Sequence, residues 1–212
     1  MSNMELFIFV IAGFTLILFL FRAALGYRHY KHSIYPHIYD NYLIDYFYKL
    51  NVLQDASKSS LIRKLIGYHR IVYANIANKQ GQLVSQIITI IHAKGLLVIS
   101  HLNSPGSFSG NDSGNWLIRR KEENEDKKYK IENPVIYLRE YTTHLANTLE
   151  NRKVQSVIAL SDEADITNLH PTVRVVRYSD LQTVIKEADC GYGLNNEDID
   201  EIFRKLGGKL NH

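Results

Sequence analysis

The chain begins with one continuous apolar segment, and shorter periodic patterns follow it. Residues 6–21 read LFIFVIAGFTLILFLF and carry no charge. With the small and apolar residues that continue to position 26, the run approaches the roughly 20 residues that cross a bilayer as a helix. We therefore expect residues 1–26 to be a transmembrane anchor that contacts the membrane through residues 6–26.

Positive charges flank this segment on one side only. The leading residues MSNMELF hold no Lys or Arg, whereas Arg22, Arg28 and Lys31 follow the run. A secretory signal peptide shows the opposite charge order and a small-residue cleavage site. The positive-inside rule predicts a single-pass protein of the cell membrane, with its N-terminus outside and its C-terminal domain in the cytoplasm. A cleaved signal and a buried core helix are the alternatives.

A tyrosine-rich juxtamembrane segment is expected at residues 27–54. Residues 27–48 contain seven of the 14 tyrosines, and a phenol ring suits the boundary between membrane and water. From Tyr39 onward the aromatic and apolar residues recur at helical spacing, so this part is predicted to pack on the domain. A platform that stacks nucleic-acid bases is the alternative. The histidines here have no regular spacing, so no metal site is expected.

The remaining chain alternates between helical and extended patterns. Helices are expected at 55–66, from Pro134 to about Asn151, after Ser179, and at Glu197–Leu206. Strands are expected at His69–Asn75, Leu83–His92, Leu96–His101, Val154–Leu160 and Val173–Tyr178. Ser57 or Asp55 is the expected cap of the first helix, Ser179 of the short one, and Asn195 or Asn196 of the last. Asn103–Asn115 is read as a loop and Arg119–Lys130 as a solvated hairpin tip.

This order predicts an α/β (α+β) fold. The second and third strands are nearly continuous runs of Ile, Val and Leu, which is typical of strands covered on both faces. We expect one central mixed β-sheet flanked by helices in residues 55–178, followed by a C-terminal helical extension at 179–212.

Composition narrows the possible chemistry. Hydrophobic residues make up 45% and charged residues 22%, which is typical of a globular protein. The single cysteine, Cys190, excludes an internal disulfide framework and any multi-cysteine zinc or iron–sulfur site. Phosphate-binding glycine loops and the nucleophile elbow have no match in the sequence. No small-molecule cofactor is therefore expected.

The net charge of +3 is unevenly distributed. Residues 22–130 hold 16 Lys and Arg against 8 Asp and Glu, so this part could face phosphates or anionic lipid. The simpler interpretation is a solvated face beside anionic lipid. The candidates for nucleic-acid contact are Arg63, Lys64, Arg70, Lys94, Arg119 and Arg120.

Several segments together resemble a known family. They are Tyr68–Asn75, the strand pair SQIITIIHAKGLLVIS at Ser85–Ser100, NSPGSFSG with a later Trp at Asn103–Trp116, and the Asn133-Pro134 helix start. In this order they resemble the nuclease-related domain (NERD) family, whose members share the restriction-endonuclease-like PD-(D/E)XK core. The resemblance covers roughly residues 55–160. It implies a domain that cleaves phosphodiesters with a divalent metal, usually Mg²⁺, held by an Asp and an acidic-x-Lys motif.

The residues that would perform this chemistry are replaced here. Aligned on the family pattern, the Asp position is Ile88, the second acidic position is Ser100 and the lysine position is Leu102. An isoleucine offers no oxygen to a metal, and a leucine cannot donate to a phosphate. No Asp or Glu occurs between Asp55 and Asp112, so a shift of the alignment restores no carboxylate.

We therefore expect a catalytically degenerate, membrane-anchored NERD-like protein with a binding or scaffolding role at the cytoplasmic face. Its partner would be a nucleic acid or an unidentified protein, and no metal or other cofactor would be held. The alternative is an active metal-dependent nuclease with a migrated site, which would need Mg²⁺.

Overall fold

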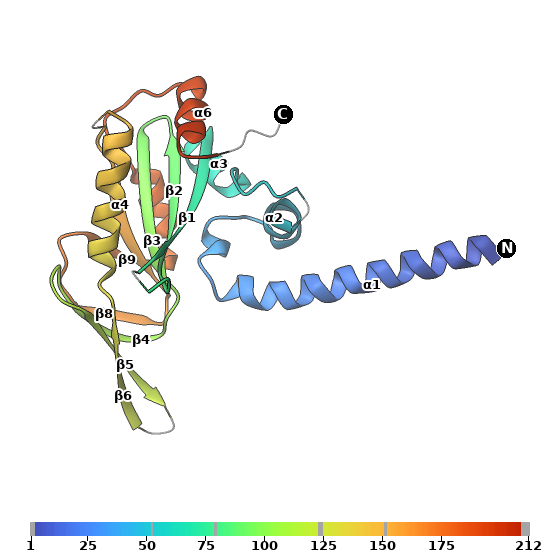
Figure 1. The fold of residues 1–212 in the computed structure, drawn as a ribbon, viewed down its shortest axis with the longest axis horizontal. Coiled ribbons are helices and arrows are strands. Elements are labelled where there is room, and N and C mark those ends of the chain that lie inside the picture. The colour runs from blue at the N-terminus through green and yellow to red at the C-terminus, as the bar shows by residue number, and fades with distance from the viewer. Residues whose placement is uncertain (1–2, 52, 79, 123–124, 151, 209–212) are drawn as a thin grey trace.

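The structure is a computed structural model that describes residues 3–51, 53–78, 80–122, 125–150 and 152–208 of the chain (Figure 1). It is a mixed α/β structure in which two mixed β-sheets are flanked by helices and one long apolar helix precedes them. The helices are α1 (Asn3–Lys31), α2 (Lys49–Asn51), α3 (Ser60–Ile66), α4 (Pro134–Thr148), α5 (Leu181–Glu187) and α6 (Asn196–Lys205). Two 3₁₀ turns, Tyr35–His37 and Tyr178–Asp180, and a π-helix, Tyr42–Tyr48, join them.

The first sheet has the strand order β1-β2-β3-β7-β9. Its strands are β1 (His69–Ala77), β2 (Leu83–His92), β3 (Gly95–Leu102), β7 (Gln155–Leu160) and β9 (Arg174–Arg177). The first three are antiparallel, and β7 and β9 run parallel to β3. Because β3 and β7 are parallel, the chain must cross over between them, and α4 lies in this connection.

The second sheet has the order β6-β5-β4-β8. Its strands are β4 (Gly106–Gly110), β5 (Trp116–Glu122), β6 (Glu125–Ile131) and β8 (Ala164–Leu169). Strands β5 and β6 form a hairpin that extends beyond the domain (Figure 1). This agrees with the hairpin predicted for the charged segment Arg119–Lys130. The expectation of a single sheet was wrong, because the sequence patterns of β4 and β8 are too short and too polar to identify.

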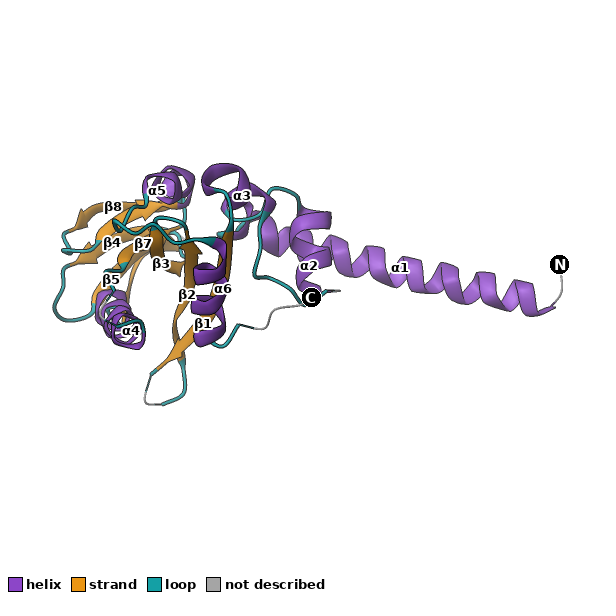
Figure 2. Cartoon of the chain, turned by 90° about the horizontal axis from the view of Figure 1, so that it is seen from above, coloured by secondary structure: helices purple, strands orange, loops and turns teal. Residues whose placement is uncertain are grey.

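Two apolar cores lie on the two faces of the first sheet. Helices α4 and α6 cover one face, where their side chains meet the buried Phe108 and Trp116 of the second sheet. Helices α3 and α5 cover the other face (Figure 2). Successive side chains of β2 and β3 point in turn into one core and then into the other. Apolar residues are therefore needed at consecutive positions, which explains the continuous apolar runs in the sequence.

The tyrosine-rich segment belongs to the second of these cores. Ile34, Ile38 and Tyr39 are fully buried there, and the Tyr39 hydroxyl lies 2.7 Å from that of Tyr73 on β1. The prediction that part of this segment packs on the domain is confirmed.

Helix α1 extends away from the domain (Figure 1). Its segment Leu6–Lys31 is 26 residues long and, by length and composition, apolar enough to cross a membrane. Only 6% of the most apolar stretch is buried against the rest of the described chain, so α1 is no core helix of this domain. A membrane anchor and a signal sequence both contain such a helix.

Two of the expected helix caps differ in the structure, and one is confirmed. The cap of α3 is Ser59, whose hydroxyl accepts the Ile62 N–H at 3.1 Å, whereas Asp55 accepts the Ser57 N–H in the preceding turn. Ser179 lies inside a 3₁₀ turn and caps no helix. The Asn195 cap of α6 is confirmed, with a capping box that includes Asp198. Helix α4 ends at Thr148; its expected end, Asn151, lies outside the described residues.

Candidate functional site

The β2–β3 hairpin holds the positions where the family resemblance implies metal ligands. Ile88 pairs with Ile99 and enters the core under α3 and α5. Ser100 pairs with Ile87, which enters the opposite core under α4 and α6. Successive side chains of a strand point to opposite faces, so Ile88 does not converge with Ser100 and Leu102. The β2 residues that share the face of Ser100 are Ser85, Ile87 and Thr89.

This face carries hydroxyl and methyl groups in place of carboxylates. The hydroxyls of Ser85 and Ser100 lie 2.8 Å apart, both side chains are buried, and each is the other's hydrogen-bond partner. The Thr89 hydroxyl lies 3.1 Å from that of Tyr141 on α4. Mg²⁺ prefers several charged or carbonyl oxygens and retains waters, so these residues do not fit the metal that the resemblance implies.

A cavity of about 290 Å³ opens at the same end of the hairpin. Its walls include Leu102 from β3, Asn78 and Gln82 from the β1–β2 turn, and Glu132 before α4. The Glu132 carboxylate accepts hydrogen bonds from the Tyr137 hydroxyl and from the Asn78 amide, which lower its pKa. Glu132 is the single acidic residue among the described residues that line this cavity, and both of its oxygens already have partners.

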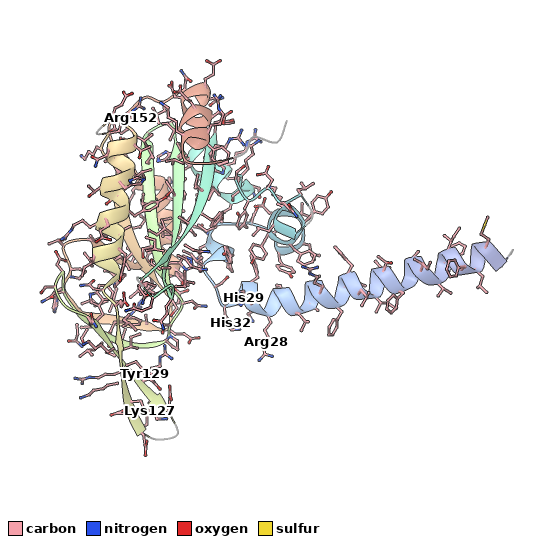
Figure 3. All side chains as sticks on the ribbon, in the orientation of Figure 1. Arg28, His29, His32, Lys127, Tyr129 and Arg152 are labelled. Atoms are coloured by element: carbon pink, nitrogen blue, oxygen red, sulfur yellow. The ribbon has the colours of Figure 1, made fainter. Side chains whose placement is uncertain are left out.

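A second cavity, of about 300 Å³, lies where β3, β7 and β9 end. Ligand sites of α/β sheets favour the carboxyl ends of parallel strands. Here His37 Nε2 lies 3.9 Å from Asp162, whose other carboxylate oxygen accepts the Ser179 N–H at 2.8 Å. Burial lowers the pKa of His37 and outweighs the opposing effect of Asp162. His32 also lines this cavity, and Figure 3 shows it at the end of α1 that meets the domain.

Metal-binding geometry is absent from the described part of the chain. Within residues 3–51, 53–78, 80–122, 125–150 and 152–208, no group of three or more His, Cys, Asp or Glu side chains is placed to hold an ion. His101, near the second cavity, is buried, and desolvation lowers its pKa to about 4. It is therefore a neutral core residue at physiological pH, with a weak 3.5 Å contact to the Tyr178 hydroxyl.

Arg70 is not available to a phosphate. It is buried on β1, and its Nε donates to Asp200 of α6 at 2.6 Å. Its guanidinium also lies 5.3 Å from the centre of the Phe203 ring and donates to the Tyr68 hydroxyl at 3.2 Å. The guanidinium lowers the pKa of Asp200, so the pair is ionised near neutral pH and joins α6 to the sheet.

The other basic candidates do not form one patch. Lys64 on α3 pairs with Asp40, and Lys94 in the β2–β3 turn lies 3.6 Å from Asp189. Arg63 lines a cavity of about 230 Å³ with Lys49 and Lys58. In Figure 1 the β2–β3 turn and the β5–β6 hairpin lie at opposite ends of the domain.

Arg119 and Arg120 occupy opposite faces of the β5–β6 hairpin. The Arg120 Nε donates to the Pro105 carbonyl at 3.0 Å, and its guanidinium lies 5.4 Å from the centre of the Tyr129 ring. Figure 3 shows Tyr129 and Lys127 on this projecting hairpin. Lys127 in turn forms an ion pair with Glu122 at 3.3 Å. The two cations of this face, Arg120 and Lys127, therefore already have partners within the domain.

The opposite face of the hairpin is cationic and has few partners. Arg119 lies directly across from Lys128, and Lys130 and Lys121 flank them on the same face. All four side chains are exposed, and none of them forms an ion pair with another described residue. Among the described residues of the hairpin, Asp126, opposite Lys121, is the acidic residue of this face. Of these four cations, only Arg119 was predicted from the sequence to contact nucleic acid. The spacing of two residues along each strand was the signal that could have identified the others.

Comparison with known proteins identifies no relative. No protein-family model, no curated protein and no solved structure matches this chain.

The Arg70–Asp200 pair predicts a measurable loss of stability. Asp200→Ala leaves the buried guanidinium without its counter-charge and should lower the free energy of unfolding by about 2–4 kcal/mol. Urea unfolding of the full chain in detergent micelles, followed by the fluorescence of the buried Trp116, measures it. Glu187→Ala is the control, since its pair with Arg174 is exposed at 3.5 Å, and it should change stability by less than about 0.5 kcal/mol. Equal losses in both variants would contradict a structural role for Arg70.

Proposed function

We propose that this protein is a membrane-anchored, non-cleaving nucleic-acid-binding protein. Helix α1 would cross the cell membrane with the N-terminus outside, because Arg22, Arg28 and Lys31 follow its apolar run. The domain would then lie in the cytoplasm. Its sheet, with three antiparallel strands, a crossover helix and a parallel strand, is compatible with a degenerate NERD-like core.

The cationic face of the β5–β6 hairpin is the observation that carries this proposal. Like charges directly opposite each other on a two-stranded ribbon repel, at a cost of about 0.2–1 kcal/mol per pair. The pair Arg119–Lys128 has this arrangement and lies on the exposed side of the hairpin. An anion that bridges the two side chains would convert the repulsion into attraction, and phosphates of a nucleic acid supply such anions at regular intervals.

The shape of the hairpin favours nucleic acid over lipid. The major groove of B-form DNA admits a two-stranded β-ribbon, and the projecting hairpin is of this kind. Hairpin and α1 leave the domain in different directions, so a membrane crossed by α1 would not meet the hairpin (Figure 1). An anionic bilayer surface is therefore the less suitable partner for this face.

Loss of cleavage is supported by the chemistry of β2 and β3. The strand faces that meet under α4 present Ser85, Ile87, Thr89 and Ser100, and none of these is a carboxylate. Without an acidic ligand set, neither a bound Lewis acid nor an activated water is available. A binding role leaves the core intact and does not require these groups.

We expect no metal-dependent reaction. The full chain in detergent micelles, given Mg²⁺ or Mn²⁺ and labelled DNA, should leave the DNA uncut, and its unfolding temperature should not shift with either ion. Cleavage that depends on the ion and disappears in Glu132→Gln would instead identify a migrated active site in the cavity beside Leu102.

Neutralising the cationic face should weaken DNA binding in a salt-dependent manner. Arg119→Ser with Lys128→Ser removes two cations, which should reduce the slope of log affinity against log salt by about 1.8. Fluorescence anisotropy of a labelled duplex with the full chain in micelles, over a range of salt concentrations, gives this slope.

The matched control is Arg174→Ser with Lys186→Ser, which removes the same charge from β9 and α5. It should leave the slope unchanged. Equal effects of the two double variants would indicate attraction by net charge alone, and binding that ignores salt would favour a protein partner in place of nucleic acid.

A further inference from the structure

The π-helix Tyr42–Tyr48 and the residues that follow it expose an unusual number of apolar side chains. Leu43, Ile44, Tyr48 and Leu53 are 54%, 69%, 45% and 50% exposed. Residues four positions apart, such as Leu43 with Phe47 and Ile44 with Tyr48, lie near one another on a helix surface. The segment therefore has an apolar face that the described part of the domain does not cover.

This face continues the apolar surface of α1. The ring of Phe47 lies 5.3 Å from that of Phe19, near the C-terminal end of the charge-free run. The Tyr42 hydroxyl donates to the Ala23 carbonyl, and its ring lies 5.1 Å from that of Tyr27. A Cβ at Gly26 would approach the Tyr42 hydroxyl to 2.5 Å, so glycine permits this close contact. The segment thus lies alongside α1 (Figures 1 and 2).

The position of Phe19 sets the depth of this segment in a membrane. A hydrocarbon core about 30 Å thick takes about 20 helical residues at 1.5 Å each. Measured from Leu6, the first residue after Glu5, the core ends near Leu25, which places Phe19 about 9 Å inside it. A ring in contact with Phe19 lies at a similar depth. The apolar side chains beside Phe47 then reach a depth that matches the roughly 5–10 Å to which the apolar face of an interfacial amphipathic helix is inserted.

The polar groups of the segment already have partners on the side of the domain. The Asn41 side chain accepts the N–H groups of Leu43 and Ile44 at 2.9 and 3.1 Å. Asp45 is buried, and its carboxylate accepts hydrogen bonds from Lys49 and from the Ser60 hydroxyl at 2.7 Å, which lower its pKa although burial opposes them. Insertion of the apolar face would therefore leave no charge or backbone donor of these groups unpaired.

We propose that residues 42–51 form an amphipathic element that lies in the membrane interface, with Leu43, Ile44 and Tyr48 in contact with lipid. The element fixes the orientation of the domain against the bilayer, because it is joined to α1 through Phe47 and to α3 through Asp45. This proposal depends on the membrane anchor proposed above.

A single fluorescent label tests the insertion. In a Cys190→Ser background, Ile44→Cys carries an environment-sensitive dye, and the full chain is reconstituted into vesicles of phosphatidylcholine and phosphatidylglycerol. Nitroxide groups attached at the headgroup or deep in the acyl chain quench dyes at their own depth. We expect the Ile44→Cys dye to be quenched several-fold more by the shallow nitroxide than by the deep one.

Dyes at two control sites distinguish a failure of the interfacial element from a failure of the membrane anchor. Thr15→Cys, in the middle of the apolar run, should be quenched by the deep nitroxide. Ile136→Cys, on an exposed position of α4 that is 43% accessible, should be quenched by neither. Quenching at position 15 without quenching at 44 would overturn the interfacial element alone. No quenching at 15 would overturn the anchor and the element together, and equal quenching at 44 and 136 would overturn a contact confined to this segment.

Discussion

The placement of the whole molecule depends on one constraint: the apolar surface of α1 must be removed from water. Its side chains from Leu6 to Phe21 are largely exposed in the isolated chain, and burial of each large one is worth about 1.5–3 kcal/mol. The described part of the domain does not supply this cover, since only 6% of the most apolar stretch of α1 is buried against it. In the proposed function a bilayer would supply it, and the charges after the run would then determine the side on which the domain lies. The proposed roles of the hairpin and of residues 42–51 both depend on this placement.

The alternation of side chains along β2 and β3 determines what the central sheet can do. From Ile87 to the end of β2, and in β3 as far as His101, every residue is buried, so the side chains of this part of the hairpin are covered on both faces of the sheet. A divalent metal would need carboxylates converging on one face near the cavity that Leu102 lines. In place of them the structure has a closed Ser85–Ser100 hydroxyl pair and a carboxylate, Glu132, that is held by Tyr137 and Asn78. These contacts stabilise the fold and leave the exposed hairpin as the feature suited to binding.

The sequence predicted the elements whose signals are local. Long β-branched runs located β2 and β3, and an Asn-Pro start and an Asn cap at position 195 or 196 located α4 and α6. Strands β4 and β8 were missed because GSFSG and ADITNL have weak strand preference and are ordered by their parallel pairing with each other. The role of Arg70 was also unpredictable, because its partner Asp200 lies 130 residues away in the sequence. The resemblance implied that Ile88 and Ser100 occupy one site, but the hairpin register His92↔Gly95 places Ile88 opposite Ile99 and so assigns Ser100 to the other face.

The proposed membrane anchorage is tested most directly by determining on which side of the membrane the domain lies. Intact cells that express the chain with a C-terminal tag are treated with a protease, with and without permeabilisation of the membrane, and the membranes are then extracted with alkaline carbonate. A membrane anchor with a cytoplasmic domain predicts that the tag resists digestion until the membrane is permeabilised and that the chain remains in the membrane fraction. A tag digested on intact cells, or a chain released into the soluble fraction, would contradict it.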